Sequence, residues 1–277
     1  MVSEAKYPGD ASWAIDEIPY HTLDRASVKD NVLLLYIVAT AAFVEITSDV
    51  YTRHLADFFR GDADIVDWLE HGWECEEMQH GRALKRYVET AWPDFAWDEA
   101  YRGFLAEFLG FCSVDQLAPT RALELAARCV VETGTAALYR ALADMSPEPV
   151  LCAIAAAISA DEVRHYKHFY RFFLRYCENE LPSRVAVART LWARINEVDA
   201  EDAFYAFKHV YLAQNPGTEF HTDDYAEFRA RLRPLAARHF PHQMASKMLL
   251  KPLGLKAPVG RLMVPAVASA SRLLCLL

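Results

Sequence analysis

Two short segments of the chain each combine a carboxylate and an imidazole one helical turn apart. Glu77 and His80 lie in the run ECEEMQHGR, and Glu162 and His165 lie in the run DEVRHYKH. Residues i and i+3 share one face of an α-helix, so each pair can present both groups to a single point. One such pair is common on ordinary helices. Two of them in one chain are candidate metal ligands.

Two further glutamates stand where a helical bundle would place leucine. Glu45 lies in the run AAFVEIT and Glu132 in the run ARCVVETGTAAL, each among apolar and small residues. A lone buried carboxylate is costly unless it is paired or binds a cation. Two core-facing glutamates and two Glu-x-x-His pairs form the ligand set of the di-iron carboxylate bundles. The predicted metal ligands are Glu45, Glu77, His80, Glu132, Glu162 and His165.

The spacing of the glutamates predicts two helical hairpins with their ligands at equal heights. Glu45 lies 16 residues before the turn candidate Gly61, and Glu77 lies 16 residues after it. In the second hairpin the turn candidate is Pro147, with Glu132 15 residues before it and Glu162 15 residues after it. At about 1.5 Å of rise per residue, the carboxylates of each antiparallel hairpin lie level with one another. The sequence thus predicts a two-fold pseudo-repeat around one centre.

Four long helices are needed to position these ligands. Helix-breaking residues place them at about 28–60, 62–92, 119–145 and 148–178, with Ser27 as the expected N-cap of the first. Residues 93–118 form the expected crossover between the hairpins, with a short helix over 98–110. The predicted fold class is all-α: a ferritin-like four-helix bundle of two pseudo-repeated hairpins with a crossover, plus additional C-terminal helices.

Composition and charge are those of an ordinary globular protein. The chain has 277 residues, 53% of them hydrophobic and 24% charged. Its formal net charge of −9 argues against a nucleic-acid partner, which would need a basic surface. Its cysteines form no C-x-x-C pair, which argues against a built-in rubredoxin-type iron site. No apolar leader and no apolar run of 18 residues is visible, so we expect a cytoplasmic protein.

We expect a single domain over residues 1–277, built on the core bundle of about 28–178, with an irregular arm over residues 1–26. C-terminal helices are expected over about 182–277. The tail 252–277 is apolar and punctuated by prolines. Packing on the bundle, contact with a dimer mate and contact with a membrane are all open readings of this tail.

The C-terminal region is expected to begin with one helix over 182–214. A further helix starts near Asp223, and Pro234 and Pro241 would kink or split it, because proline lacks the N–H that the helix needs.

Four carboxylates and two imidazoles make a hard, oxygen-rich ligand set. Such a set suits iron or manganese better than copper, and it has too many ligands for an ordinary catalytic zinc. Bridging carboxylates would hold two metal ions a few Å apart. Two ferrous ions can deliver electrons together to O₂, and the resulting oxidant can attack unactivated C–H bonds. We therefore expect two Fe ions, or a mixed Mn/Fe pair, with O₂ as co-substrate.

Three further residues are expected to support the ligands. Thr135 lies one turn after Glu132, where its hydroxyl could pass a proton or instead bond its own i−4 carbonyl. Asp161 and Glu76 directly precede the glutamates of the two Glu-x-x-His pairs. Such acids commonly accept the second ring N–H of a ligating histidine. Thr135 and Asp161 are therefore the candidates for a catalytic supporting role.

The segments around the ligands resemble those of a known family. EEMQHG and DEVRHY resemble the EENRHG and DEKRHE boxes of the soluble acyl-carrier-protein desaturases. VEITSDVY resembles that family's first-helix run TEEALPTY, with Glu45 at the ligand position. Glu132 followed by Thr135 matches the third ligand and a threonine proposed there to handle protons and oxygen. The matched segments span about 45–168, and the order and spacing of all six ligands agree.

This resemblance implies a ferritin-like di-iron enzyme, usually a homodimer, that uses O₂ and electrons from an external donor such as reduced ferredoxin. Its substrate would be a fatty acyl chain on an acyl carrier protein, bent in a deep apolar tunnel beside the metals. Tyr166 replaces an acidic residue of the family pattern, and residues 170–277 carry no family motif. Desaturation and hydroxylation therefore both stay open.

Single residues distinguish this chain from other di-iron proteins of the superfamily that it resembles. An aryl-amine N-oxygenase of this superfamily carries a histidine where this chain has Ile158. A ribonucleotide reductase radical subunit usually has Asp and Tyr where this chain has Glu45 and Leu84. A di-iron N-oxygenase or other oxidase of a small metabolite, and a non-catalytic helical metal-binding protein, are the alternatives. A carrier protein is acidic, so its docking site would be basic. The candidate dock consists of Arg164, Lys167, Arg171 and Arg175. The alternative is that these residues form an ordinary solvated helix face.

Overall fold

The computed structural model describes residues 13–111, 117–197 and 202–275. Every regular element in these residues is a helix, and they contain no strand, which confirms the predicted all-α class. Among the described residues, the central helices are α2 (Val32–Ile46), α3 (Ser48–Phe58), α4 (Ala63–Trp68), α5 (Glu74–Ala91), α7 (Arg121–Met145) and α8 (Pro149–Glu180).

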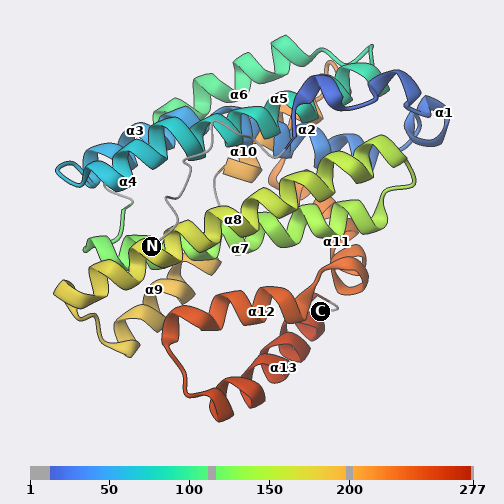
Figure 1. Ribbon diagram of the computed structural model, residues 1–277. Helices are drawn as coiled ribbons and strands as arrows, with labels where there is room; N and C mark the ends of the chain where they lie inside the picture. Colours follow the sequence, from blue (N-terminus) through green and yellow to red (C-terminus); the bar gives the residue numbers. More distant parts are fainter. Residues whose placement is uncertain (1–12, 112–116, 198–201, 276–277) are drawn as a thin grey trace.

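These helices form two packed pairs (Figure 1). Helix α2 lies along α5, and α7 lies along α8 over most of its length. The two pairs meet where α5 contacts α8. Each pair is a hairpin in the chain, as the ligand spacing predicts.

The first hairpin begins and bends differently from the prediction. The expected helix over 28–60 is divided into α1 (Arg25–Val28), α2 and α3. Asn31 caps α2 by accepting a hydrogen bond from the backbone N–H of Leu34, so the predicted N-cap Ser27 is wrong. Thr47 separates α2 from α3, because its hydroxyl donates to the carbonyl of Val44 and competes with the helical hydrogen bonds. The break falls two residues after Glu45.

The second helix of this hairpin contains a π-helical turn. Gly61 adopts φ +95°, a left-handed conformation that favours glycine, and reverses the chain between α3 and α4. The expected helix over 62–92 is then present as α4, the π-turn η3 (Leu69–Trp73) and α5. Single π-turns inside α-helices are rare and occur mostly at functional sites. This one ends four residues before Glu77.

The second hairpin follows the predicted bounds closely. Thr120 caps α7, and Glu148 caps α8 by accepting a hydrogen bond from the N–H of Leu151 at 2.9 Å. Pro149 occupies the first turn of α8, where its missing N–H costs nothing. The crossover carries α6 (Trp97–Phe111), which confirms the helix expected over 98–110. Residues 112–116 of the crossover lie outside the described residues.

The C-terminal region adds helices on two sides of the hairpins. They are α9 (Arg184–Glu197), α10 (Asp202–Gln214), α11 (Thr222–His239), α12 (His242–Leu250), the short 3-10 turn η5 (Lys251–Leu253) and α13 (Ala257–Leu274). The helix expected over 182–214 is described as two parts with different partners, because α9 packs on α7 while α10 packs on α2 and α6. Pro234 lies inside α11, and Pro241 separates α11 from α12, as predicted.

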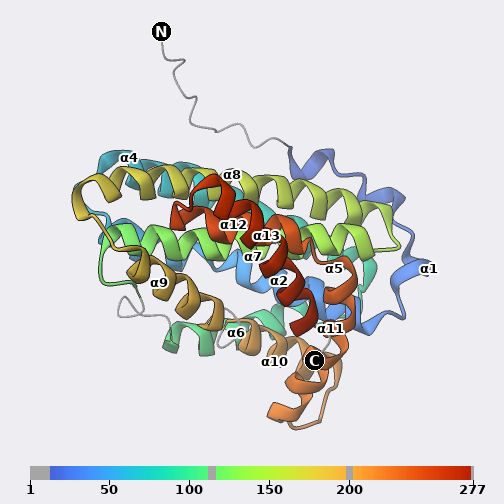
Figure 2. The ribbon, with the colours of Figure 1, turned by 90° about the horizontal axis from the view of Figure 1, so that it is seen from below.

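The N-terminal arm is partly described. It contains 3-10 turns over Ile15–Glu17 and Tyr20–Thr22, in agreement with the expected irregular conformation. Figure 2 shows the described part of this arm, from residue 13 on, on the side of the molecule where α8 lies. Trp13, the first described residue of this arm, donates a hydrogen bond from its indole N–H to Asp161 on α8.

Two apolar clusters fill the interior, and the predicted ligands lie between them. One cluster contains Phe43, Leu84 and Tyr139, and the other contains Trp73 and Phe169. The stretch Val32–Phe58 is long and apolar enough to cross a membrane by length and composition, but 72% of its apolar part is buried inside the protein. It is therefore packed as a core helix, with Glu45 on its buried side.

Candidate metal centre

The structure brings all six predicted ligands together in the interior. Glu45 comes from α2, one Glu-x-x-His pair from α5, Glu132 from α7 and the other pair from α8. All six side chains are buried. They form two groups of four, and in each group one ligand atom per residue lies within 4.8 Å of the others. The first group is Glu45, Glu77, His80 and Glu162, and the second is Glu77, Glu132, Glu162 and His165.

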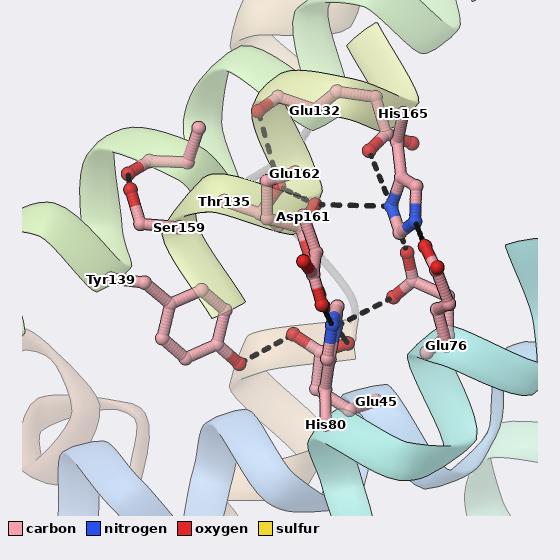
Figure 3. Close-up of polar contacts among 12 residues, drawn as sticks. Glu45, Glu76, His80, Glu132, Thr135, Tyr139, Ser159, Asp161, Glu162 and His165 are labelled. Carbon is pink, nitrogen blue, oxygen red and sulfur yellow. Dashed lines mark hydrogen bonds and ion pairs between the residues drawn. The ribbon is translucent and has the colours of Figure 1, made fainter. Parts of the chain in front are cut away.

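Glu77 and Glu162 belong to both groups, which is the position of bridging carboxylates. His80 Nδ1 lies 3.2 Å from Glu162 Oε1, and His165 Nδ1 lies 3.0 Å from Glu77 Oε1. Each imidazole therefore faces the carboxylate of the other hairpin (Figure 3). Glu132 Oε2 is 3.5 Å from His165 Nδ1 and completes the second group.

Several buried polar atoms of the centre lack hydrogen bonds, and their positions show whether metal ions fit here. Four buried atoms of the centre make no hydrogen bond of good geometry with a described residue: Nδ1 of His80, Nδ1 of His165, Glu132 Oε2 and Glu162 Oε1. The two imidazole nitrogens lie 3.0–3.2 Å from carboxylate oxygens, but these contacts lack hydrogen-bond geometry. Buried polar atoms are normally paired, since an unpaired one loses its hydration without compensation. All four belong to the two groups. The lone pairs are thus arranged as two cations would require.

The charge balance of the centre also favours bound metal ions. Burial, then the charges of Glu162 and Glu45, raise the pKa of Glu77 well above its usual range. Burial also raises the pKa of Glu132. Four buried carboxylates repel one another, whereas two divalent cations with neutral imidazoles would balance their charge. The residues fit a pair of metal ions.

The acids next to the bridging glutamates brace the histidines of the opposite helix. His80 on α5 contacts Asp161 on α8, with Nε2 3.0 Å from the carboxylate. His165 on α8 contacts Glu76 on α5, with Nε2 2.7 Å from the carboxylate. Each ring thereby presents Nδ1 to the centre. Burial lowers the pKa of both imidazoles, but the surrounding carboxylates outweigh it and raise the pKa.

Two residues beyond the predicted set hold these acids in place. Arg164 forms ion pairs with both Glu76, at 2.9 Å, and Asp161. The indole N–H of Trp13 donates to Asp161 at 2.9 Å. Burial would raise the pKa of Asp161, but the hydrogen bonds from His80 and Trp13 and the charge of Arg164 lower it to about 2. Asp161 is therefore an ionised acceptor.

Thr135 reaches a bridging carboxylate. Its hydroxyl lies 2.6 Å from Glu162 Oε2, and also 3.2 Å from the carbonyl of Val131. The bond to the i−4 carbonyl, which the sequence analysis left as one alternative, is present beside a contact with a ligand carboxylate. A hydroxyl has one proton, and the shorter contact favours donation to Glu162.

Tyr139 is a site residue that the sequence analysis missed. Its buried hydroxyl hydrogen-bonds Glu45 Oε1, which leaves the other carboxylate oxygen toward the centre (Figure 3). Tyr139 lies seven residues, or two turns, after Glu132 on α7, and this spacing was the available signal. Trp13 offered no such signal, because the arm has no regular period.

Helices α2 and α5 of the first hairpin approach each other closely beside the ligands. A Cβ added to Gly81 would lie 2.8 Å from the backbone nitrogen of Ile46 and 3.1 Å from Glu45 Cβ. Only glycine allows this approach. It sets the distance between Glu45 and the ligand pair of α5.

Two hollows of the described surface lie away from the centre. One, of about 470 Å³, is lined by α9 and the segment after η5, and another, of about 320 Å³, lies at the turn between α3 and α4. None of the six ligands lines either hollow. The deep apolar tunnel that the resemblance implies is therefore not among these hollows.

The candidate dock on α8 is partly engaged within the chain. Arg164 pairs with buried acids, and Arg175 pairs with Asp62 and Asp64. Lys167 is exposed. Two of the four cations of the candidate dock are therefore paired with acids of the same chain.

Comparisons with known proteins give no relative. No protein-family model, no curated protein and no solved structure matches the chain. The described part of the protein is all-helical. It contains two buried, connected groups of carboxylates and histidines that are compatible with a di-metal site.

Proposed function

We propose that the protein is a non-haem di-iron oxidoreductase built on a ferritin-like bundle. The observation that carries this proposal is the sharing of Glu77 and Glu162 between the two groups of ligand atoms. In this assignment Glu45 and His80 complete one iron site, and Glu132 and His165 complete the other. A bound pair of ferrous ions would supply electrons to O₂ for the oxidation of a C–H bond.

The residues around the ligands have separate tasks in this proposal. Asp161 and Glu76 hold the histidine rings with Nδ1 toward the centre. Thr135 holds a proton at its hydroxyl beside Glu162 and is the candidate proton donor. Tyr139 restrains Glu45. The surrounding apolar clusters exclude water, which strengthens every electrostatic interaction inside.

The substrate proposed is an acyl chain, presented by an acyl carrier protein and desaturated or hydroxylated. An external donor such as ferredoxin would supply the electrons, as the resemblance implies. We further propose a cytoplasmic, homodimeric enzyme. These assignments rest on the resemblance of the ligand segments.

Metal analysis tests the proposal directly. Protein produced in iron-replete cells is expected to contain about two irons per chain, in line with the two groups of ligands. Mössbauer spectra of the reduced protein, before and after exposure to O₂, should show both irons oxidised together. Glu77→Ala and Glu162→Ala should each lose both irons, because each removes a ligand shared by the two sites. Glu70→Ala, on the exposed side of the same helical segment, is the matched control.

The outcome also separates the alternatives. Two irons without O₂ reactivity would leave a non-catalytic metal-binding protein. O₂ consumption that responds to an aryl amine or another small metabolite, and not to carrier-bound acyl chains, would favour the N-oxygenase or another oxidase. Absence of bound metal in the wild-type protein would overturn the proposal.

A further inference from the structure

The C-terminal part of the chain has a charge opposite to that of the rest. Residues 228–277 contain nine lysines and arginines and no aspartate or glutamate. The preceding residues contain 20 basic and 38 acidic side chains, since the whole chain has 29 and 38. A protein of formal charge −9 therefore carries +9 in this segment and −18 elsewhere. Four of the nine cations lie on α11, whose first turns also carry three acids, whereas residues 240–277 contain five cations and no acid. The charge of residues 240–277 favours an anionic partner.

Helix α13 turns an apolar stripe outward. Leu262 is 76% exposed and Leu273 59% exposed, and they lie 11 residues, or about three turns, apart. Pro265 and Ser269 lie between them on the same side and are exposed too. Ala268 is the only buried residue of this helix, all of which belongs to the described residues. The helix thus rests on its neighbours by a narrow strip and presents leucine to the outside.

Cations flank this stripe. Arg261 and Arg272 each precede one of the two leucines and share one flank of the helix, because they too are 11 residues apart. Both are exposed, as are Lys247 and Lys256, and none of the four has an ion pair among the described residues. Arginine can lay its stem along an apolar surface while its guanidinium reaches a phosphate.

Helix α9 extends the same character. This helix carries three arginines and one acid, Glu197, at its C-terminal end. Arg194 pairs with the buried Glu124, so Arg184 and Arg189 are the cations that this helix adds to the surface. Trp192 is 68% exposed and borders the 470 Å³ hollow, together with Arg189 and Leu255. Exposed tryptophan beside cations is typical of the interface between a membrane and water.

These helices lie on one side of the molecule. Figure 1 shows α9, α12 and α13 below α7 and α8, and Figure 2 looks onto them. Contacts of α9 and α12 with α7, and of α13 with α12, agree with this placement. We call this surface, formed by α9, α12 and α13, the basic apolar face.

We propose that the basic apolar face docks the protein on the surface of an anionic lipid membrane, with α13 lying in the plane of the interface. Leu262 and Leu273 enter the boundary of the acyl chains, while Arg261 and Arg272 contact lipid phosphates. A second copy of the chain fits this face less well, because a two-fold contact would set the same cations against each other. The proposal is independent of the metal centre.

Vesicle flotation with the full-length protein tests this docking. The protein is expected to float with vesicles of phosphatidylcholine mixed with phosphatidylglycerol, and not with phosphatidylcholine alone. Added salt should weaken the binding. Leu262→Asp combined with Leu273→Asp should weaken it at least about ten-fold, since both leucines lose their apolar burial. Leu109→Asp, an exposed leucine on α6, is the matched control.

Two variants separate the contributions of charge and apolar surface. Arg261→Gln combined with Arg272→Gln should reduce the preference for the anionic vesicles at least about ten-fold, at roughly 1 kcal/mol for each cation near the surface. Circular dichroism checks that each variant stays folded. Failure of the wild-type protein to bind anionic vesicles, or equal binding by the double-aspartate variant, would overturn the proposal. Failure with vesicles but salt-sensitive binding to an acidic carrier protein would assign the face to that partner.

Discussion

The imidazole of His165 on α8 and the carboxylate of Glu76 on α5 form a 2.7 Å hydrogen bond between the two hairpins. The symmetric contact joins His80 on α5 to Asp161 on α8 at 3.0 Å. Each Glu-x-x-His helix therefore orients the histidine of the other. The centre therefore depends on both hairpins at once.

Removing one of these braces should weaken metal binding. In Glu76→Gln and Asp161→Asn the side chain keeps its size but loses the charge that fixes the ring of the opposite histidine. We expect iron affinity to fall by roughly 10-fold to 100-fold in each variant, as measured by competition with a chelator. Glu70→Gln, an exposed neighbour on the same helical segment, should bind iron like the wild type. Equal affinities in all variants would contradict the bracing role.

A methyl group at Gly81 should disturb the centre. Gly81→Ala places a carbon 2.8 Å from the backbone nitrogen of Ile46, which cannot move without shifting α2. We expect a loss of stability of roughly 1–3 kcal/mol and a lower iron content, measured by urea unfolding and metal analysis.

Gly134 is the matched control for that substitution. It lies inside α7, and an added Cβ there meets nothing within 4 Å. Gly134→Ala should therefore raise stability by roughly 0.5–1 kcal/mol, because alanine favours the helix. Destabilisation by both substitutions to the same extent would show that close approach at Gly81 is not the cause.

The hydroxyl of Thr135 should matter for turnover and not for metal content. Thr135→Val keeps the shape of the side chain and removes the hydrogen bond to Glu162. We expect two irons to remain bound, while substrate-dependent O₂ consumption falls at least about ten-fold, the lower end for loss of a proton-transfer group. Thr135→Ser should restore the rate and its pH dependence. A fully active Thr135→Val protein would remove Thr135 from the proposed proton transfer.

His168 should make stability fall in mild acid. Burial and then the charge of Arg171 lower the pKa of His168 from 6.5 to about 4, and its ring stacks on Trp68. Between these two pH values the unfolded chain binds a proton that the folded chain does not. The free energy of unfolding should therefore decrease as the pH falls from 6.5 toward 4.

The magnitude of this effect is bounded by the pKa shift. The full shift corresponds to about 3 kcal/mol, and the partly exposed ring should give less. His168→Phe keeps an aromatic ring on Trp68 and removes the titrating group. Urea unfolding across this pH range should show a shallower dependence in the variant, and identical slopes would disprove the assignment to His168.

The sequence by itself determined the helical class and the residues that gather at the centre. Glu45 and Glu132 stand out because a carboxylate in an apolar helical segment requires a partner. The two Glu-x-x-His pairs follow from the period of the helix, and the equal spacings around Gly61 and Pro147 follow from its rise. These are local rules, and local rules can be read along the chain.

Tertiary structure alone decided which groups touch. Asp161 bonds a histidine 81 residues away, and Trp13 reaches Asp161 across 148 residues. Arg164, expected on an outer dock, binds buried acids. The outward leucines of α13 likewise depend on which side of that helix rests on its neighbours. Such contacts are set by how helices pack and turn against one another, and the spacing within each helix does not contain that information.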